Sequence, residues 1–183
     1  MEANDDQQLK QMIQDPQTRR KGFEAAVRQY SEQLYWQVRR IVLNHDDADD
    51  VIQNTFLKAW NALDTFKGDS KLLTWLTRIA INEALDYTRR QKTHTTLSAD
   101  SDTTGIANRL MADEYFDGEE TEAQLQEAIA SLPEVQRTVF LMRYYDEMKY
   151  SEISQVTGTS EGGLKASYHL AVKKITDYFH RHD

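Results

Sequence analysis

The stretch TSEGGLKASYHLAVKKI, residues 159–175, carries residue types that can contact DNA. Gly162 and Gly163 have no side chains, so the backbone at a helix start there could approach a phosphate closely. Apolar residues recur every three or four positions and should face a core: Leu164, Tyr168, Val172, Ile175 and Phe179. The opposite side would present Lys165, Ala166, His169 and Lys173. A solvated basic face on an ordinary amphipathic helix fits the same spacing, and spacing alone leaves both interpretations open.

A helix-turn-helix is the element that would present this face to a DNA groove. The sequence predicts a short helix over about 149–157 that stops at Gly158, a residue suited to a left-handed C-cap. Ser160 should then cap a helix that runs to about Phe179, and its N-terminal half would meet base edges. A further helix should start at Leu132-Pro133-Glu134, with Pro133 as its first helical residue.

A second candidate is the segment FKGDSKLLTW, where Phe66 and Trp75 flank the basic Lys67 and Lys71 around a glycine turn. Aromatic rings beside cations can stack on unpaired nucleobases. A loop packed by its own phenylalanine is the alternative interpretation. Ser70 should cap a helix over about 70–91. Ile81 and Leu85 lie across from that helix's main apolar face, so we expect it to be covered on more than one side.

A third candidate is the polar face of a helix expected over about 46–63 and preceded by Asn44, a good N-cap. Its apolar stripe should consist of Ile52, Thr55, Phe56, Ala59 and Leu63. The opposite face carries Asp49, Asp50, Gln53 and Asn54. A plain solvated face is the alternative. The run HDDADD does not fit a calcium loop, because the alternating ligands, central glycine and closing glutamate are missing.

Motifs for catalysis and cofactor binding are absent from the sequence. The five histidines lack metal-ligand spacing, and no P-loop, G-x-S-x-G or H-E-x-x-H occurs. There are no cysteines, which suits a reducing cytoplasm, and no apolar run approaches the roughly 18 residues of a membrane span. We therefore expect a cytoplasmic protein that is not an enzyme, with no metal, no cofactor and no membrane insertion.

Composition and charge divide the chain into three zones. Only two prolines and seven glycines interrupt long stretches of helix-forming residues, so the predicted class is all-α. We expect helical domains over 1–91 and 120–183, with Pro16 separating the first two helices. A flexible acidic linker over 92–119 should hold one short helix near 106–111. Residues 92–131 carry nine acids against two bases, which is most of the net charge of −8. Whole-chain acidity therefore does not argue against DNA binding by the flanking domains.

Two segments resemble a known family. HDDADDVIQNTFLKAWNAL with FKGDSKLLTWLTRIAINEALDYTRR resembles region 2 of extracytoplasmic-function (ECF) sigma factors. LQEAIASLPEVQRTVFLMRYYDEMKYSEISQVTGTSEGGLKASYHLAVKKI resembles their region 4. The two matches lie in the family's order and cover roughly 130 of the 183 residues. The resemblance implies two small helical domains that bind core RNA polymerase and direct it to promoters.

The resemblance also implies roles for region 2 residues. The polar face Asp49, Asp50, Gln53 and Asn54 would contact core polymerase. Family members commonly carry an acid where Asn54 stands. The loop would capture a flipped base of the −10 non-template strand, through Phe66, Lys67, Gly68, Asp69, Ser70 and Lys71 with Asn82. Melting and strand tracking would use Trp75, Arg78, Arg89 and Arg90.

For region 4, the resemblance implies that the recognition helix reads the −35 element. Lys165, Ala166 and His169 would meet base edges, with Ser167 and Lys173 nearer the backbone. Many members have arginines where Ser167, Leu170 and Val172 stand, so this helix would bind duplex DNA weakly by itself. The acidic linker would run toward the polymerase's basic RNA exit path. An anti-sigma factor that occludes both domains is a further expectation.

Two rival functions remain at this stage. A transcription regulator with a C-terminal helix-turn-helix would bind duplex DNA tightly without polymerase. A helical adaptor would bind only proteins. Binding to core polymerase distinguishes the sigma factor from the transcription regulator and the helical adaptor.

Overall fold

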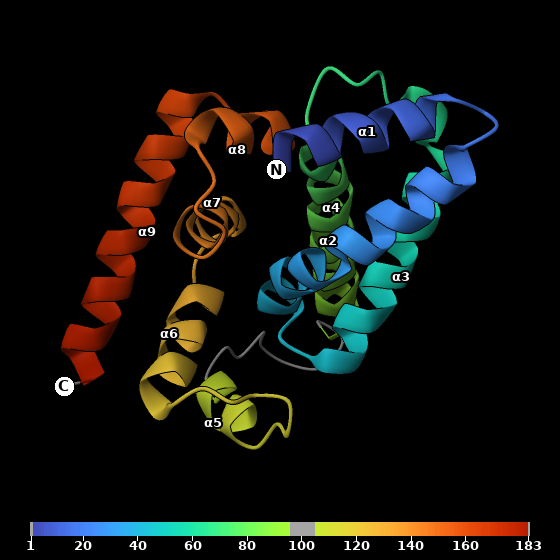
Figure 1. Cartoon of the computed structure of the whole chain (residues 1–183). Helices are drawn as coiled ribbons and strands as arrows, with labels where there is room; N and C mark the ends of the chain where they lie inside the picture. Colours follow the sequence, from blue (N-terminus) through green and yellow to red (C-terminus); the bar gives the residue numbers. More distant parts are fainter. Residues whose placement is uncertain (1, 96–104, 183) are drawn as a thin grey trace. The chain divides into compact units, whose positions relative to one another are not determined.

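The structure, a computed structural model, describes residues 2–95 and 105–182, without the side chains of residues 2–4, 95 and 182. Residues 96–104, the middle of the predicted linker, lie outside the described residues. Every regular element in those two ranges is a helix, which confirms the all-α class. The chain forms two compact units, residues 1–87 and 88–183 (Figure 1). In the described ranges, no helix has the length and apolarity needed to cross a membrane.

The first unit contains α1 (Glu2–Gln14), α2 (Arg19–Val42), α3 (His45–Asn61), a short 3-10 helix (Leu63–Thr65) and most of α4 (Leu72–Thr95). Figure 1 shows α2 running beside α3. The core is made of aliphatic side chains from all four α-helices, with Ile13, Leu34, Val51 and Leu76 each at most 2% exposed. Burial of such side chains is the main stabilising term of a small helical unit.

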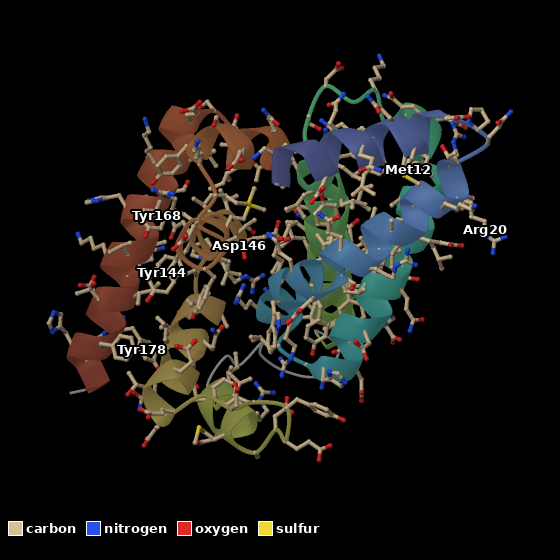
Figure 2. The ribbon with its side chains drawn as sticks, viewed as in Figure 1. Met12, Arg20, Tyr144, Asp146, Tyr168 and Tyr178 are labelled. Carbon is tan, nitrogen blue, oxygen red and sulfur yellow. The ribbon has the colours of Figure 1, made fainter. Side chains whose placement is uncertain are left out.

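The turn between α1 and α2 is fixed by side chains that satisfy the last carbonyls of α1. Thr18 Oγ1 donates to the Met12 carbonyl at 2.9 Å, and Arg19 Nε donates to the Ile13 carbonyl at 3.1 Å. Gly22 lets the two helices approach, because a Cβ there would lie 2.7 Å from Met12 Cβ. Figure 2 labels Met12 on α1. The sequence predicted this break at Pro16.

Helix α3 begins as predicted and is rotated slightly from the predicted stripe. Asn44 is the N-cap, and its side chain accepts the Asp47 N–H at 3.0 Å. Thr55, Ala59 and Leu63 are buried, whereas Ile52 is only half-buried. Phe56 is half-buried as well, and Ala48 and Val51 complete the buried stripe. The prediction therefore placed the core face a fraction of a turn too far round the helix.

Helix α4 starts two residues later than predicted. Its first residue is Leu72, so Ser70 lies outside the helix. The Leu72 N–H donates to Asp6 Oδ1 of α1 at 3.0 Å. A carboxylate suits this place, because the first N–H groups of a helix lack internal partners and the dipole favours negative charge. Ile81 and Leu85 are buried as well as Leu76, which confirms that α4 is covered on more than one side.

The second unit contains the end of α4 and five further helices: α5 (Ile106–Met111), α6 (Glu120–Ala130), α7 (Glu134–Tyr144), α8 (Tyr150–Thr157) and α9 (Glu161–His182). Helix α5 confirms the short helix predicted near 106–111. It packs on α6 through the buried Ile106 and Leu110, and the Ala107 N–H donates to Glu127 Oε2 at 2.9 Å. Pro133 is the N-cap of α7 rather than its first helical residue.

The buried stripe of α9 departs from the predicted one most clearly at Val172, and the predicted Tyr168 and Phe179 are only half-buried. Leu164 and Ala171 are fully buried and Ile175 is 8% exposed, whereas Val172 is 38% exposed. At about 100° per residue, Val172 lies roughly 80° past the line through Leu164, and Ala171 lies only about 20° short of it. The prediction that Val172 faces the core was wrong, because a step of eight residues overshoots two helical turns.

Candidate nucleic-acid interface

The α8–turn–α9 segment has the predicted helix-turn-helix geometry. Helix α8 ends at Gly158, which has φ 73°, the left-handed conformation that glycine adopts without a Cβ penalty. Ser160 Oγ accepts the Gly163 N–H at 3.2 Å and so caps α9. Leu164 of α9 and Ile153 of α8 are fully buried. These local interactions fix the turn, and with it the direction in which the outer face of α9 points.

The outer face of α9 presents the predicted residues to solvent. Lys165, Ala166, His169 and Lys173 are exposed, and Ser167 is half-buried. A Cβ at Gly162 would meet nothing within 4 Å, so the backbone of the first turn is open. The structure therefore brings the −35 candidates together on one accessible face. Glu161, exposed in the same turn, is an acid that DNA phosphates would have to approach.

Lys165 is held over an aromatic ring that the sequence analysis did not include. Its Nζ lies 5.7 Å from the centroid of the Tyr150 ring, and the Arg143 guanidinium carbon lies 5.4 Å from the same centroid. These distances fall in the range of cation–π attraction. Tyr168 packs beneath on Phe140, with ring centroids 5.8 Å apart, and Figure 2 labels Tyr168 on α9. The missed signal was the aromatic residue at the first position of the preceding helix.

The loop before α4 is built on an aromatic pair. Phe66 is buried, and its ring centroid lies 5.1 Å from that of the half-buried Trp75. Gly68 has φ 80°, a conformation that other residues rarely adopt. Lys67, Asp69 and Lys71 are exposed, and Ser70 is half-buried. Phe66 therefore packs the loop from beneath, as the alternative interpretation held, while polar groups line its outer side.

The α4 candidates follow one face of the helix. Trp75, Arg78, Asn82 and Arg89 are spaced by three, four and seven residues, and Arg78, Asn82 and Arg89 are exposed. This spacing aligns them along roughly 21 Å of helix. Arg90 is exposed on the neighbouring side. Within the second unit, Arg89 Nε donates to Glu134 Oε2 at 3.0 Å, and this pairing lowers the pKa of the Glu134 carboxyl.

The exposed face of α3 contains more than the predicted polar residues. Asp49, Asp50, Gln53 and Asn54 are all exposed. Leu57 follows Gln53 by one helical turn and is 62% exposed, and Trp60 is 42% exposed. The sequence analysis missed these two side chains. Leu57 and Trp60 therefore add two exposed apolar side chains beside the polar residues of this face.

In residues 2–95 and 105–182, no group of three or more histidine, aspartate or glutamate side chains is arranged to hold a metal ion. The arrangement of exposed cations, aromatic rings and open backbone favours binding of a polyanion.

Family models match both units. The sigma-70 region 2 model matches residues 26–94, and the sigma-70 region 4 model matches residues 122–175. The ECF RNA polymerase sigma-E factor of Escherichia coli (strain K12) is 31% identical over 163 residues, which are 85% of each chain. The chain belongs to the ECF family of RNA polymerase sigma factors. A sigma factor is not an enzyme; it binds core RNA polymerase and DNA and directs the polymerase to promoters.

One further relative and two solved structures were compared with the chain, and the two structures show the same fold. The RNA polymerase sigma-H factor of Pseudomonas aeruginosa is 30% identical to this sigma factor over 186 residues, covering 93% of this chain and 91% of the relative. The structure of CnrH in complex with the cytosolic domain of CnrY matches the fold with a TM-score of 0.72 at 23% identity, over 98% of this chain and 99% of that one. RpoE of Bartonella quintana, solved with the anti-sigma factor NepR, matches with a TM-score of 0.67 at 21% identity, over 87% and 97% of the two chains.

Proposed function

We propose that three surfaces of this sigma factor divide the work of initiation. The outer face of α9 reads the −35 duplex, the 66–71 loop with the face of α4 captures and melts the −10 element, and the exposed face of α3 docks on core polymerase. One observation supports the −35 assignment best: Lys165, Ala166, His169 and Lys173 are exposed opposite the buried Leu164 and Ala171.

The −35 surface is expected to bind weakly unless polymerase holds it in place. The exposed Leu170 and Val172 stand where many family members carry arginines, and apolar side chains release no counterions from DNA. Affinity for the promoter then depends on several contacts acting together in the holoenzyme. This weakness distinguishes the sigma role from that of a regulator that binds duplex DNA alone.

The −10 surface combines the packed Phe66–Trp75 pair with the exposed polar side chains of the 66–71 loop. Extruding a base from the stack costs free energy, which stacking and cationic groups in a preformed pocket can offset. The Phe66–Trp75 pair supports the loop, and Asn82 lies two helical turns after Trp75 on the same face of α4. We assign base capture to the loop and strand tracking to Arg78, Arg89 and Arg90.

The core-binding surface extends beyond the polar residues. Asp49, Asp50, Gln53 and Asn54 supply polar contacts, and Leu57 would supply the apolar anchor that interfaces usually need near their centre. Because Leu57 is mostly exposed in the free chain, docking buries it at little cost to the fold.

Two further proposals concern the setting. Sigma factors work where RNA polymerase meets the chromosome, so we place this chain in the bacterial cytoplasm.

CnrH and RpoE were solved with the cytosolic domain of CnrY and with the anti-sigma factor NepR. We infer that an anti-sigma factor occludes this chain as well. The proposal is supported if a second protein co-purifies with the tagged chain from its host and competes with core polymerase for it. Recovery of core polymerase with no competing protein contradicts the proposal.

Reconstituted transcription tests the main proposal. The purified chain is mixed with Escherichia coli core polymerase and duplexes randomised in both promoter elements, and run-off transcripts are sequenced. Transcripts from an enriched two-element motif, absent without the chain, support the sigma role. A chain that fails to co-elute with any bacterial core polymerase is not acting as proposed, and tight binding to an enriched duplex without polymerase would favour the regulator. Lys165→Ala should lower enrichment at the −35 element alone.

A further inference from the structure

One face of α1 lies against the loop that we assign to base capture. Asp6, Lys10 and Gln14 are spaced by four residues, which places them in a row along the helix. Leu9 and Ile13, on the neighbouring row, are buried at 6% and 1% exposure and anchor α1 in the core. The first row is therefore free to contact the loop while the second row holds the helix in place.

Asp6 fixes the end of the loop where α4 begins. Its Oδ1 accepts the Leu72 N–H at 3.0 Å, and its Oδ2 pairs with Lys10 Nζ at 3.1 Å. The two side chains are only 17% and 14% exposed, so solvent screens this pair less than a surface pair. Leu72 precedes Trp75 by three residues, about one helical turn. The Asp6 contact therefore holds the first turn of α4, which precedes Trp75, against α1.

Lys10 and Gln14 contact the loop at Gly68. Lys10 Nζ donates to the Gly68 carbonyl at 3.5 Å, a long hydrogen bond from a charged donor. A Cβ at Gly68 would lie 2.9 Å from Gln14 Nε2, so the Gln14 amide lies directly against this glycine. Gly68 is also the loop residue with φ 80°. The α1 contacts therefore cover the most conformationally demanding position of the loop.

We propose that Asp6 and Lys10 are positioning residues that hold the 66–71 loop in its base-accepting shape before DNA arrives. The proposal rests on the proposed −10 function of the loop. A loop that is already ordered loses less conformational entropy on binding, so the bracing raises affinity for the flipped base. Neither residue needs to touch DNA for this effect. No residue of α1 was among the site residues expected from the sequence.

Hydrogen exchange of the Leu72 amide tests the bracing without DNA or polymerase. Asp6→Ala should speed this exchange roughly fivefold, the typical effect of losing a helix-capping acceptor. Asp6→Asn keeps an oxygen acceptor and should retain most of the protection. Asp5→Ala, at an exposed position next along α1, is the matched control and should change nothing. Equal protection of Leu72 in Asp6→Ala and the unaltered chain would overturn the proposal.

Binding of single-stranded −10 DNA tests the functional consequence. The probe is the non-template −10 oligonucleotide found by the transcription selection, with 2-aminopurine at the flipped position, titrated with holoenzyme. Asp6→Ala should weaken binding roughly fivefold and Lys10→Met roughly twofold. The double variant should lose less affinity than the two single effects multiplied together, because Asp6 and Lys10 share one ion pair. Core polymerase and −35 duplex affinities should stay unchanged.

These outcomes distinguish three failures: failure of the loop bracing by Asp6 and Lys10, a general loss of fold, and failure of the proposed sigma function. Equal losses of core binding and −10 binding in Asp6→Ala would mean that Asp6 only stabilises the first unit, which overturns the bracing. If the unaltered chain supports transcription and Asp6→Ala binds the oligonucleotide normally, the bracing alone fails. If the unaltered chain yields no transcription with core polymerase, the proposed function fails, whatever the exchange rate of Leu72.

Discussion

Lys165 and Tyr150 form a cation–π contact across the helix-turn-helix, with the ammonium nitrogen 5.7 Å from the ring centroid. Tyr150 is the first residue of α8, and Lys165 lies in the first turns of α9. The contact gives a flexible lysine a preferred direction. A side chain that is already oriented loses less rotamer freedom when it meets a base edge.

The first prediction follows from that contact. Tyr150→Leu should weaken −35 duplex binding by the holoenzyme roughly threefold, since cation–π contacts at exposed sites contribute about 0.5–1 kcal/mol. Tyr150→Phe keeps the ring face and should bind like the unaltered chain. Fluorescence anisotropy with a labelled −35 duplex measures both variants. Equal losses in the two variants would point to the hydroxyl group and against the ring.

Lys173 should make a phosphate contact, which the salt dependence of binding can reveal. Lys173→Ala should reduce the slope of log affinity against log salt concentration by about 0.9, the value for one lost phosphate contact on duplex DNA. Lys174→Ala is the matched control, because Lys174 is also exposed but lies about 100° further round α9. If both variants change the slope equally, the helix is not oriented on DNA as proposed.

Trp75 should be required for promoter opening and dispensable for polymerase binding. Trp75→Ala removes a ring that packs on Phe66 beside the loop and should slow open-complex formation at least roughly tenfold, the scale of a lost base–aromatic stack. Trp75→Phe should recover part of the rate. Permanganate reactivity of unpaired thymines follows opening, and co-elution follows polymerase binding. A parallel loss of both activities would contradict the division of labour.

Leu57 should contribute to docking on core polymerase. Its side chain is 62% exposed, so Leu57→Ala should change the free energy of unfolding by no more than about 0.5 kcal/mol. Loss of an interface anchor should weaken core binding roughly fivefold. Gln29→Ala, exposed on α2, serves as the control. Unaltered core affinity in Leu57→Ala would remove this residue from the docking surface.

The second unit should lose stability at alkaline pH through Tyr178. Burial raises the pKa of its phenol, helped by its hydrogen bond to Glu127 Oε1 at 2.9 Å and by repulsion from that carboxylate. Figure 2 labels Tyr178 toward the C-terminal end of α9. A raised folded-state pKa means that the stabilisation is fully present below the ordinary value of about 10 and is lost as pH rises through the folded-state value.

The measurement is urea unfolding at a series of pH values. Tyr178→Phe should be less stable at neutral pH by about 1 kcal/mol, the typical contribution of one hydrogen bond. Its stability should then decline less steeply than that of the unaltered chain above about pH 10. Parallel curves for the two chains would show that this phenol does not govern the alkaline loss.

Local signals in the sequence were sufficient to predict most of the helices and several of their ends. Asn44 and Ser160 cap α3 and α9 as predicted, and Gly158 ends α8 in the left-handed conformation. Capping involves residues within three or four positions of each other, so the sequence contains it directly. The match to both sigma regions rests on such local patterns in the right order, and the family models bear it out.

Contacts between distant residues were decided only by the tertiary structure. Asp6 meets the Leu72 N–H across 66 residues, and no periodicity links a carboxylate in α1 to the start of α4. The same holds for Leu57, whose exposure depends on how α3 packs against its neighbours. Sequence spacing determines which residues share a helical face. It does so only approximately, because the predicted stripe included Val172, which lies about 80° from the line through Leu164. Packing decides which face is buried and which side chains remain to meet polymerase and DNA.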